Sequence, residues 1–197
     1  LLLGPDVLDG PVMSRPTPLN KDTHSKTRVI SRRGAQFGDA VSYCSVVPRE
    51  FGRLITHYPI VLTKGSGSDS YNFCALFGFH ERENLFLDGE HWDVDYIPLD
   101  ILRGPFMAGV SDDGPADSGT VFLDMDDPRV QSKDGELLFE EDGKPSKYLL
   151  GIDRVLGELL TGVRQTRELV GLLEKYELIE PVSMKAAFQD GQTLDVN

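Results

Sequence analysis

The stretch that decides the fold is "SKYLLGIDRVLGELLTGVRQTRELVGLLEKY", residues 146–176, which has the strongest periodicity in the chain. Apolar side chains recur there every three or four residues, as on one face of an α-helix. They are Leu149, Ile152, Leu156, Leu159, Val163, Val170 and Leu173. Thr166 fills the gap in this stripe, and Ser146 is a suitable N-cap. We therefore predict a long amphipathic helix over about residues 147–177.

Four glycines within this stretch leave the continuity of the helix open. Glycine is a poor helix former, so the helix could break in two near Thr161 and Gly162. Alternatively, the glycines allow the helix to pack closely against a sheet.

Upstream, short runs of β-branched and apolar residues alternate with Gly, Pro and Asp, a pattern typical of short antiparallel strands. A short helix is expected near residues 48–57, because Pro48 suits a first turn and Phe51, Leu54 and Ile55 share one face. The tail, residues 184–197, predicts one more hairpin. The fold class is therefore α+β, a largely antiparallel, meander-like sheet with the long helix across one face.

The segment "ENLFLDGEHWDVDYIPLDILRGPF", residues 83–106, has the densest set of candidate functional residues. Asp88-Gly89 is a strong hairpin signal, and apolar and polar residues alternate after it. The segment therefore predicts a hairpin, followed by a helical turn that ends at Gly104-Pro105.

A metal site is one hypothesis for this segment, with His80, His91 and Asp93 as ligands. Two histidines and a carboxylate are the ligand types of zinc and ferrous sites. The alternative is that His91 is an exposed residue just after the turn, and we favour it.

A surface for a protein or peptide partner is the other hypothesis, with Trp92, Tyr96, Arg103 and Phe106 as contacts. Aromatic side chains and arginine often dominate binding interfaces. The alternative is that the aromatic residues form the core of the hairpin.

We predict no catalytic residues and no cofactor. The sequence has neither a G-x-S-x-G motif nor a dinucleotide fingerprint of the G-x-G-x-x-G type after a strand. Lys64 precedes the glycine-rich segment 65–70, but an expected strand follows it, which favours a hairpin loop over a phosphate-binding loop.

Composition restricts the partners and the compartment. A formal net charge of −12 argues against a nucleic-acid partner. No apolar run is long enough to cross a membrane, and no signal peptide is evident, so we expect a cytoplasmic protein. Cys44 and Cys74 lie in separate apolar runs, and whether they pair stays open, as does the oligomeric state.

The chain divides into an extended arm, residues 1–34, and a single domain, residues 35–197. The arm is rich in Pro, Gly, Asn and Ser, a composition that favours extended backbone over a packed core.

Several blocks of the sequence resemble the SapC family of bacteria, which is named for surface-layer association and is sometimes labelled a peptide-transport permease. They are "PTPLNKDTHSKTRV", "VPREFGRLITHYPIVLTK", "ALFGFHERENLFLDGEHWDVDYIPLDILRGPF" and "LLFEEDGKPSKYLLGI". The resemblance implies a link to the cell surface but no set of catalytic residues. It also implies further C-terminal helices beyond residue 197, and a native start at Met13 that makes residues 1–12 an addition or a variable extension.

These observations favour a soluble, non-enzymatic binding or accessory protein that recognises a protein or peptide and is linked to cell-surface or outer-membrane uptake systems. One alternative is an enzyme or enzyme subunit of a tailoring pathway, dependent on a metal at His91 and Asp93. A second is a structural component of a surface layer.

Overall fold

The long helix expected from the sequence is α4, Lys147–Lys175, in a computed structural model that describes residues 15–64, 70–110, 119–187 and 193–196. Its 29 residues run without interruption. The Ser146 hydroxyl accepts a hydrogen bond from the Leu149 amide at 3.2 Å, which confirms the expected N-cap.

The glycines of α4 do not break the helix, and one of them brings it close to the rest of the fold. A Cβ on Gly162 would lie 2.5 Å from the Val47 side chain, so only glycine allows this approach. A Cβ on Gly151, Gly157 or Gly171 would meet nothing within 4 Å. The glycines therefore do allow close packing at Gly162, but against Val47, just after strand β3, rather than against a strand.

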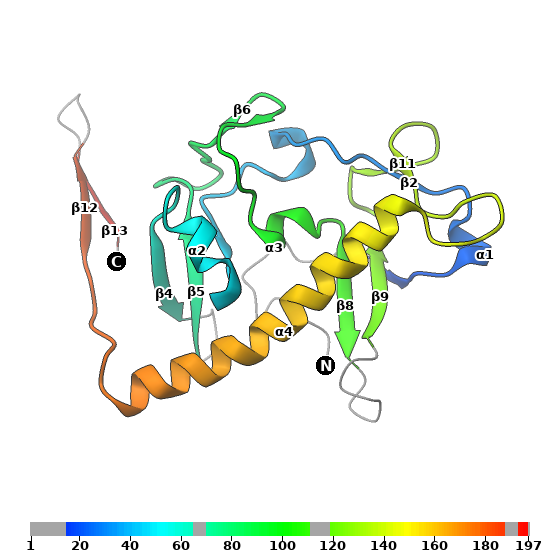
Figure 1. Cartoon of the computed structure of the whole chain (residues 1–197). Coiled ribbons are helices and arrows are strands. Elements are labelled where there is room, and N and C mark those ends of the chain that lie inside the picture. Colours follow the sequence, from blue (N-terminus) through cyan, green and yellow to red (C-terminus); the bar gives the residue numbers. More distant parts are fainter. Residues whose placement is uncertain (1–14, 65–69, 111–118, 188–192, 197) are drawn as a thin grey trace.

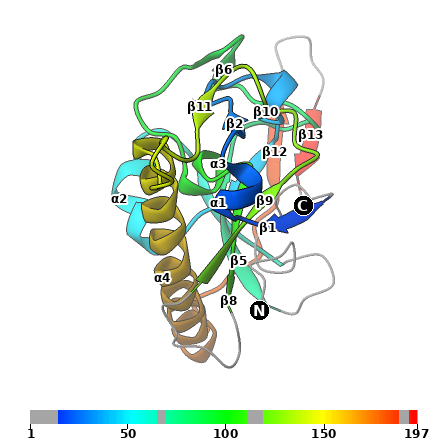
Figure 2. The ribbon, with the colours of Figure 1, turned by 90° about the vertical axis from the view of Figure 1, so that its right-hand side faces the viewer.

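Two three-stranded antiparallel sheets lie beside α4, which crosses both of them (Figures 1 and 2). The first has the order β1-β9-β8 and consists of β1 (Pro16–Pro18), β9 (Gly119–Asp124) and β8 (Phe106–Val110). The second has the order β3-β5-β4 and consists of β3 (Tyr43–Ser45), β5 (Tyr71–Leu76) and β4 (Ile60–Lys64). Strands β8 and β3 each form an edge of their sheet.

Three smaller sheets complete the strands of the described residues. They are β10 (Val130–Gln131), β2 (Arg28–Val29) and β11 (Glu136–Leu137); β6 (Leu87–Asp88) and β7 (His91–Trp92); and β12 (Met184–Ala187) and β13 (Thr193–Val196). The α+β class and the antiparallel pairing are thus confirmed. However, the strands form several small sheets rather than one meander, because most are too short to carry pairing from one sheet to the next.

The remaining helices are short. They are α1 (Lys21–His24), η1 (Ala35–Phe37), η2 (Pro48–Glu50), α2 (Phe51–Leu54) and α3 (Leu99–Leu102). The helix expected near 48–57 is present as η2 and α2, but Ile55 lies outside it and is 68% exposed. The expected sharing of one buried face by Phe51, Leu54 and Ile55 is therefore wrong for Ile55.

The hairpin expected around Asp88-Gly89 is confirmed, with Asp88 paired to His91 and Gly89 at a φ of +61°. The turn thus begins one residue later than predicted, at Gly89. The second strand ends at Trp92, although buried and exposed residues continue to alternate as far as Asp95. Strands β4 and β5 also form a hairpin, whose loop, together with the acidic loop 111–118, lies outside the described residues.

Residues 15–34 of the predicted arm include the extended strands β1 and β2 and the short helix α1, and some of their side chains pack into the core. Strand β1 pairs with β9, and β2 lies between β10 and β11. Val29 is fully buried, and His24 is 3% exposed.

Two apolar clusters lie under α4. The first, here called the β8–β9 core, includes Phe106, Leu123 and Leu159. The second, here called the aromatic core, includes Tyr58, Phe77 and Trp92. Helix α4 contributes Leu149 to Val163 of its stripe to the β8–β9 core and Val170 to the aromatic core.

Among the described residues, no helix combines the length and the apolar character needed to cross a lipid bilayer.

Candidate binding site

A cavity of about 320 Å³ lies beside edge strand β3. The chain from Gly38 to Cys44 forms one wall, and Glu81 and Arg82 lie at another. Helix α3 and the residues next to it supply Asp100, Ile101 and Gly104, and Arg129 completes the lining. We call this cavity the β3 groove.

A buried charge cluster of Arg33, Asp39 and Arg129 adjoins the β3 groove. Asp39 Oδ1 accepts a hydrogen bond from Arg129 Nη2 at 2.6 Å, and Arg33 Nη1 lies 3.4 Å from the same oxygen. The Asp39 and Arg129 side chains are only 2% and 6% exposed. Asp127 Oδ2 lies 3.4 Å from Arg129 Nη1, so a second carboxylate balances the second guanidinium.

The backbone before β3 holds Asp39 in this position. Gly34 N donates to Asp39 Oδ2 at 2.8 Å, and Asp39 N donates to Gly34 O at 3.3 Å. Gly38, between η1 and Asp39, has a φ of +83°, a conformation that side-chain-bearing residues rarely adopt. The Phe37 ring lies 5.9 Å from the Arg129 guanidinium, in cation–π contact.

Burial shifts the pKa of two residues at this cluster, Arg33 and Asp127. Desolvation lowers the pKa of Arg33, and the nearby Asp39 carboxylate opposes this effect. Burial also raises the pKa of Asp127, against hydrogen bonds from Arg129. Arg129 Nε is a buried donor without a hydrogen-bond partner among the described residues, so the cluster is not fully paired.

A second ion pair fixes the α3 wall of the groove. Arg103 Nε donates to Asp100 Oδ1 at 2.7 Å, and Arg103 Nη1 donates to the Phe106 carbonyl at 3.2 Å. Arg33 also donates to the Ile101 carbonyl at 3.0 Å and so connects this wall to the charge cluster.

Cys44 is the one thiol on the lining of the groove. Burial, with the negative charges of Asp100 and Glu50, raises the pKa of Cys44 well above its ordinary value. The thiol therefore stays protonated at neutral pH, which is unfavourable for a nucleophile. Cys44 and Cys74 are both buried, and they form no disulfide with each other.

Comparison with protein families gives one match. The family model named SapC matches residues 19–197, nearly the whole chain. The chain belongs to the SapC family. No curated protein and no solved structure matches it. The resemblance stated from the sequence blocks is thus confirmed.

In this SapC family member, the four residues expected to contact a partner do not meet on one surface. Trp92 is 5% exposed and lies in the aromatic core, whereas Phe106 is fully buried in the β8–β9 core. The Arg103 side chain is 12% exposed and is held by Asp100. Tyr96 is half-buried, with the Arg53 guanidinium 5.4 Å from its ring.

Hydrogen bonds join Trp92 and Tyr96 to the fold. Trp92 Nε1 donates to the Tyr58 hydroxyl at 2.7 Å, and that hydroxyl donates to the Tyr96 carbonyl at 2.6 Å. The Tyr96 hydroxyl donates to Glu50 Oε1 at 3.1 Å. Burial raises the pKa of Tyr58 to about 12, so its hydroxyl keeps its proton at neutral pH. These residues therefore act as structural anchors.

The residues of the metal hypothesis are His80, His91 and Asp93, and all three are exposed. His91 lies in the hairpin strand β7, and the His80 amide donates to Glu83 Oε2 at 3.1 Å. Within the described ranges, no three His, Cys, Asp or Glu side chains come together as a group able to hold a metal ion.

None of the three residues of the charge cluster was predicted from the sequence as part of a site. Asp39 and Arg129 are 90 residues apart, and no local pattern joins them. A weak signal exists in "RRGAQFGD", where a charged residue lies at each end of a glycine-rich turn. The segment 83–106 contributes Asp100, Ile101 and Gly104 to the lining of the groove, but none of its four residues that were expected to contact a partner.

Proposed function

We propose that this SapC family member is a non-enzymatic binding or accessory protein that recognises an extended segment of a protein partner in the β3 groove. The observation that carries the proposal is the position of the groove, a cavity of about 320 Å³ beside an edge strand.

An edge strand offers backbone groups to a peptide that adds to the sheet, while an adjoining cavity takes side chains of that peptide. The groove follows this geometry, because the chain from Gly38 to Cys44 forms its wall and leads into β3. The lining also includes carboxylates and guanidiniums, such as Glu81 and Arg82, which would select for charge on the bound segment.

The ionisable groups at the groove support binding rather than catalysis. Asp39 and Asp100 are each held by an arginine, and Cys44 is a protonated thiol. To act as a general base, an aspartate must be able to accept a proton from the substrate. To act as a nucleophile, a cysteine must be present as the thiolate.

The association of the SapC name with surface layers makes cell-surface and outer-membrane proteins the first partners to test. A random-peptide library selected on the immobilised protein tests the groove without knowledge of the partner. The selected peptides are then synthesised, and their affinities are measured by calorimetry.

Two alanine-to-arginine variants provide a matched pair. Ala40 lines the groove, and Ala35 is an exposed residue of η1 that does not line it. We expect Ala40→Arg to weaken peptide binding at least about tenfold and Ala35→Arg to leave it unchanged. Equal binding by both variants, or no selected peptide that binds tighter than about 1 mM, would contradict the proposal.

A further inference from the structure

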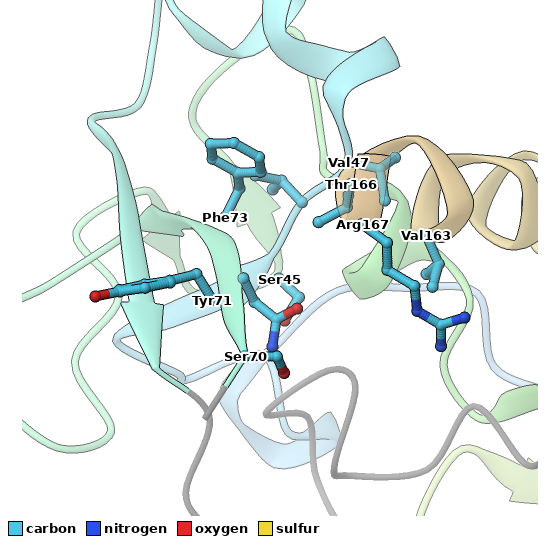
Figure 3. A pocket seen from close by; sticks show the side chains of 10 residues that line it. Ser45, Val47, Ser70, Tyr71, Phe73, Val163, Thr166 and Arg167 are labelled. Atoms are coloured by element: carbon cyan, nitrogen blue, oxygen red, sulfur yellow. The ribbon is translucent and has the colours of Figure 1, made fainter. Parts of the chain in front are cut away.

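A second, smaller cavity of about 90 Å³ lies between α4 and the sheet of β3, β5 and β4 (Figure 3). Val163, Thr166 and Arg167 line it from α4, and residues 45–47 and 70–73 line it from the other side. A single water molecule needs about 10–15 Å³ of such space. The cavity therefore has room for a small organic molecule.

Two buried hydroxyl groups of the lining have no hydrogen-bond partner among the described residues. Ser45 is 1% exposed and Thr166 is 6% exposed, and neither Ser45 Oγ nor Thr166 Oγ1 is bonded to another described residue. Buried hydroxyls without a partner are rare, because each costs about 1–3 kcal/mol. They come from different elements, so a molecule in the cavity could bond to both.

The position of Thr166 in a helix does not account for its hydroxyl having no partner among the described residues. A threonine hydroxyl in a helix can donate to the carbonyl three or four residues earlier. Thr161 does so, since its hydroxyl donates to the Gly157 carbonyl at 3.0 Å. Thr166 forms no such bond, although it lies on the same helix only five residues further on.

The rest of the lining indicates the chemistry of the occupant. Val47, Phe73 and Val163 form apolar walls, whereas Arg167 brings a guanidinium to the cavity. Arg167 forms no ion pair with another residue that the structure describes, and its side chain is seen beside the cavity in Figure 3. The contact of Gly162 with Val47 fixes the distance between the two walls.

We propose that this cavity binds a small carboxylate with a short apolar body. The Ser45 and Thr166 hydroxyls donate to the carboxylate oxygens, and the Arg167 guanidinium supplies the opposite charge. The apolar body lies against Val163 and Phe73. This site is separate from the β3 groove, and its test does not depend on peptide binding there.

The test is a titration of the ¹⁵N-labelled protein with sodium propionate, followed by NMR, with propionamide as the uncharged counterpart. We expect saturable shifts of the Ser45 and Thr166 amide signals with propionate. Propionamide should bind at least about tenfold more weakly, because hydrogen bonds to a charged group are the stronger ones.

Thr166→Val removes the hydroxyl at nearly constant shape, and Thr161→Val is its control on the same helix. Loss of one hydrogen bond to a carboxylate should weaken propionate binding about tenfold or more in Thr166→Val, and Thr161→Val should bind as the wild type does. Thr166→Val should also stay folded, since the hydroxyl it removes has no partner in the part of the chain that the structure describes.

Three results would overturn the proposal. One is the absence of saturable shifts with propionate, which would leave the cavity to ordered water. Another is equal affinity for propionamide, which would exclude recognition of the charge. The third is unchanged propionate binding by Thr166→Val.

Discussion

The aromatic core and the buried charge cluster are built from different kinds of residues, brought together over different distances along the chain. In the aromatic core, Tyr58, Phe77 and Trp92 pack edge to face, with ring centroids 5.3 and 5.4 Å apart. In the charge cluster, Arg33 and Asp39 come from one turn, whereas Arg129 comes from far along the chain. Both are buried, and Cys44 belongs to the aromatic core while lining the groove beside the cluster.

The aromatic residues that are most conspicuous in this sequence, such as Trp92, stabilise the core of the fold rather than form an exposed surface. Trp92 suggests a binding contact by its type, yet its ring fills a core and its Nε1 has an internal acceptor. The charges of the cluster belong to common residue types, and they acquire chemical significance only through burial and mutual contact.

The largest expected effect comes from breaking the charge cluster. Asp39→Ala leaves the Arg33 and Arg129 guanidiniums without their shared carboxylate, so we expect a loss of about 3–5 kcal/mol in the free energy of unfolding. Urea denaturation followed by circular dichroism measures it.

The control for this variant is Asp134→Ala, which removes one of the exposed partners of Arg32, 3.0 Å away. It should cost at most about 1 kcal/mol, and high salt should abolish that cost but not the cost of Asp39→Ala. Similar costs for the two variants would mean that the cluster is not a buried unit.

An intermediate effect is expected in the aromatic core. Tyr58→Phe keeps the ring but removes the hydroxyl that accepts from Trp92 Nε1 and donates to the Tyr96 carbonyl, so one buried and one partly buried group lose their partner. We expect a loss of about 1–3 kcal/mol in the same urea experiment. Tyr176→Phe, at a tyrosine that is 62% exposed, should leave the stability unchanged. If the two variants behave alike, the hydroxyl bridge contributes nothing.

The smallest effect concerns Glu50, which accepts hydrogen bonds from Val47 N at 3.1 Å and Leu99 N at 2.8 Å. Burial raises the pKa of Glu50 above its ordinary value, so the folded protein holds this proton to a higher pH than the unfolded chain does. Wild-type stability therefore falls, through this group, as the pH rises from the unfolded pKa to the folded one.

Glu50→Gln has no such proton, and its stability relative to the wild type should improve as the pH rises from about 4.5, the ordinary value. Thermal unfolding of both proteins at several pH values between 4 and 8 measures the difference. Parallel curves across this range would contradict a raised pKa.

The parts of the fold that sequence analysis predicted are those with a local pattern. The stripe of α4 and its cap at Ser146 span a few residues at a time, and Asp88-Gly89 marks its hairpin within two residues. The pairing of β2 with both β10 and β11, and of Asp39 with Arg129, depends on contacts across about half of the chain. Such contacts leave no trace in spacing or composition.

The candidate site was predictable in part for the same reason. The segment 83–106 stands out by composition, and Asp100 and Ile101 within it line the β3 groove. Residue type alone could not separate a core aromatic from an exposed one, because Trp and Phe suit both environments. Burial decided between these readings for Trp92 and Phe106.

The position of α4 in the chain has a consequence for synthesis. Every strand of the β8–β9 core and of the aromatic core leaves the ribosome before α4 does, yet both cores include side chains of that helix. The β8–β9 core cannot close until the turns that carry Leu149 to Val163 have emerged, and the aromatic core also needs Val170. The nascent sheets therefore expose apolar surface for longer than in a protein whose covering helix is made first, and this interval is when a chaperone would act on the chain.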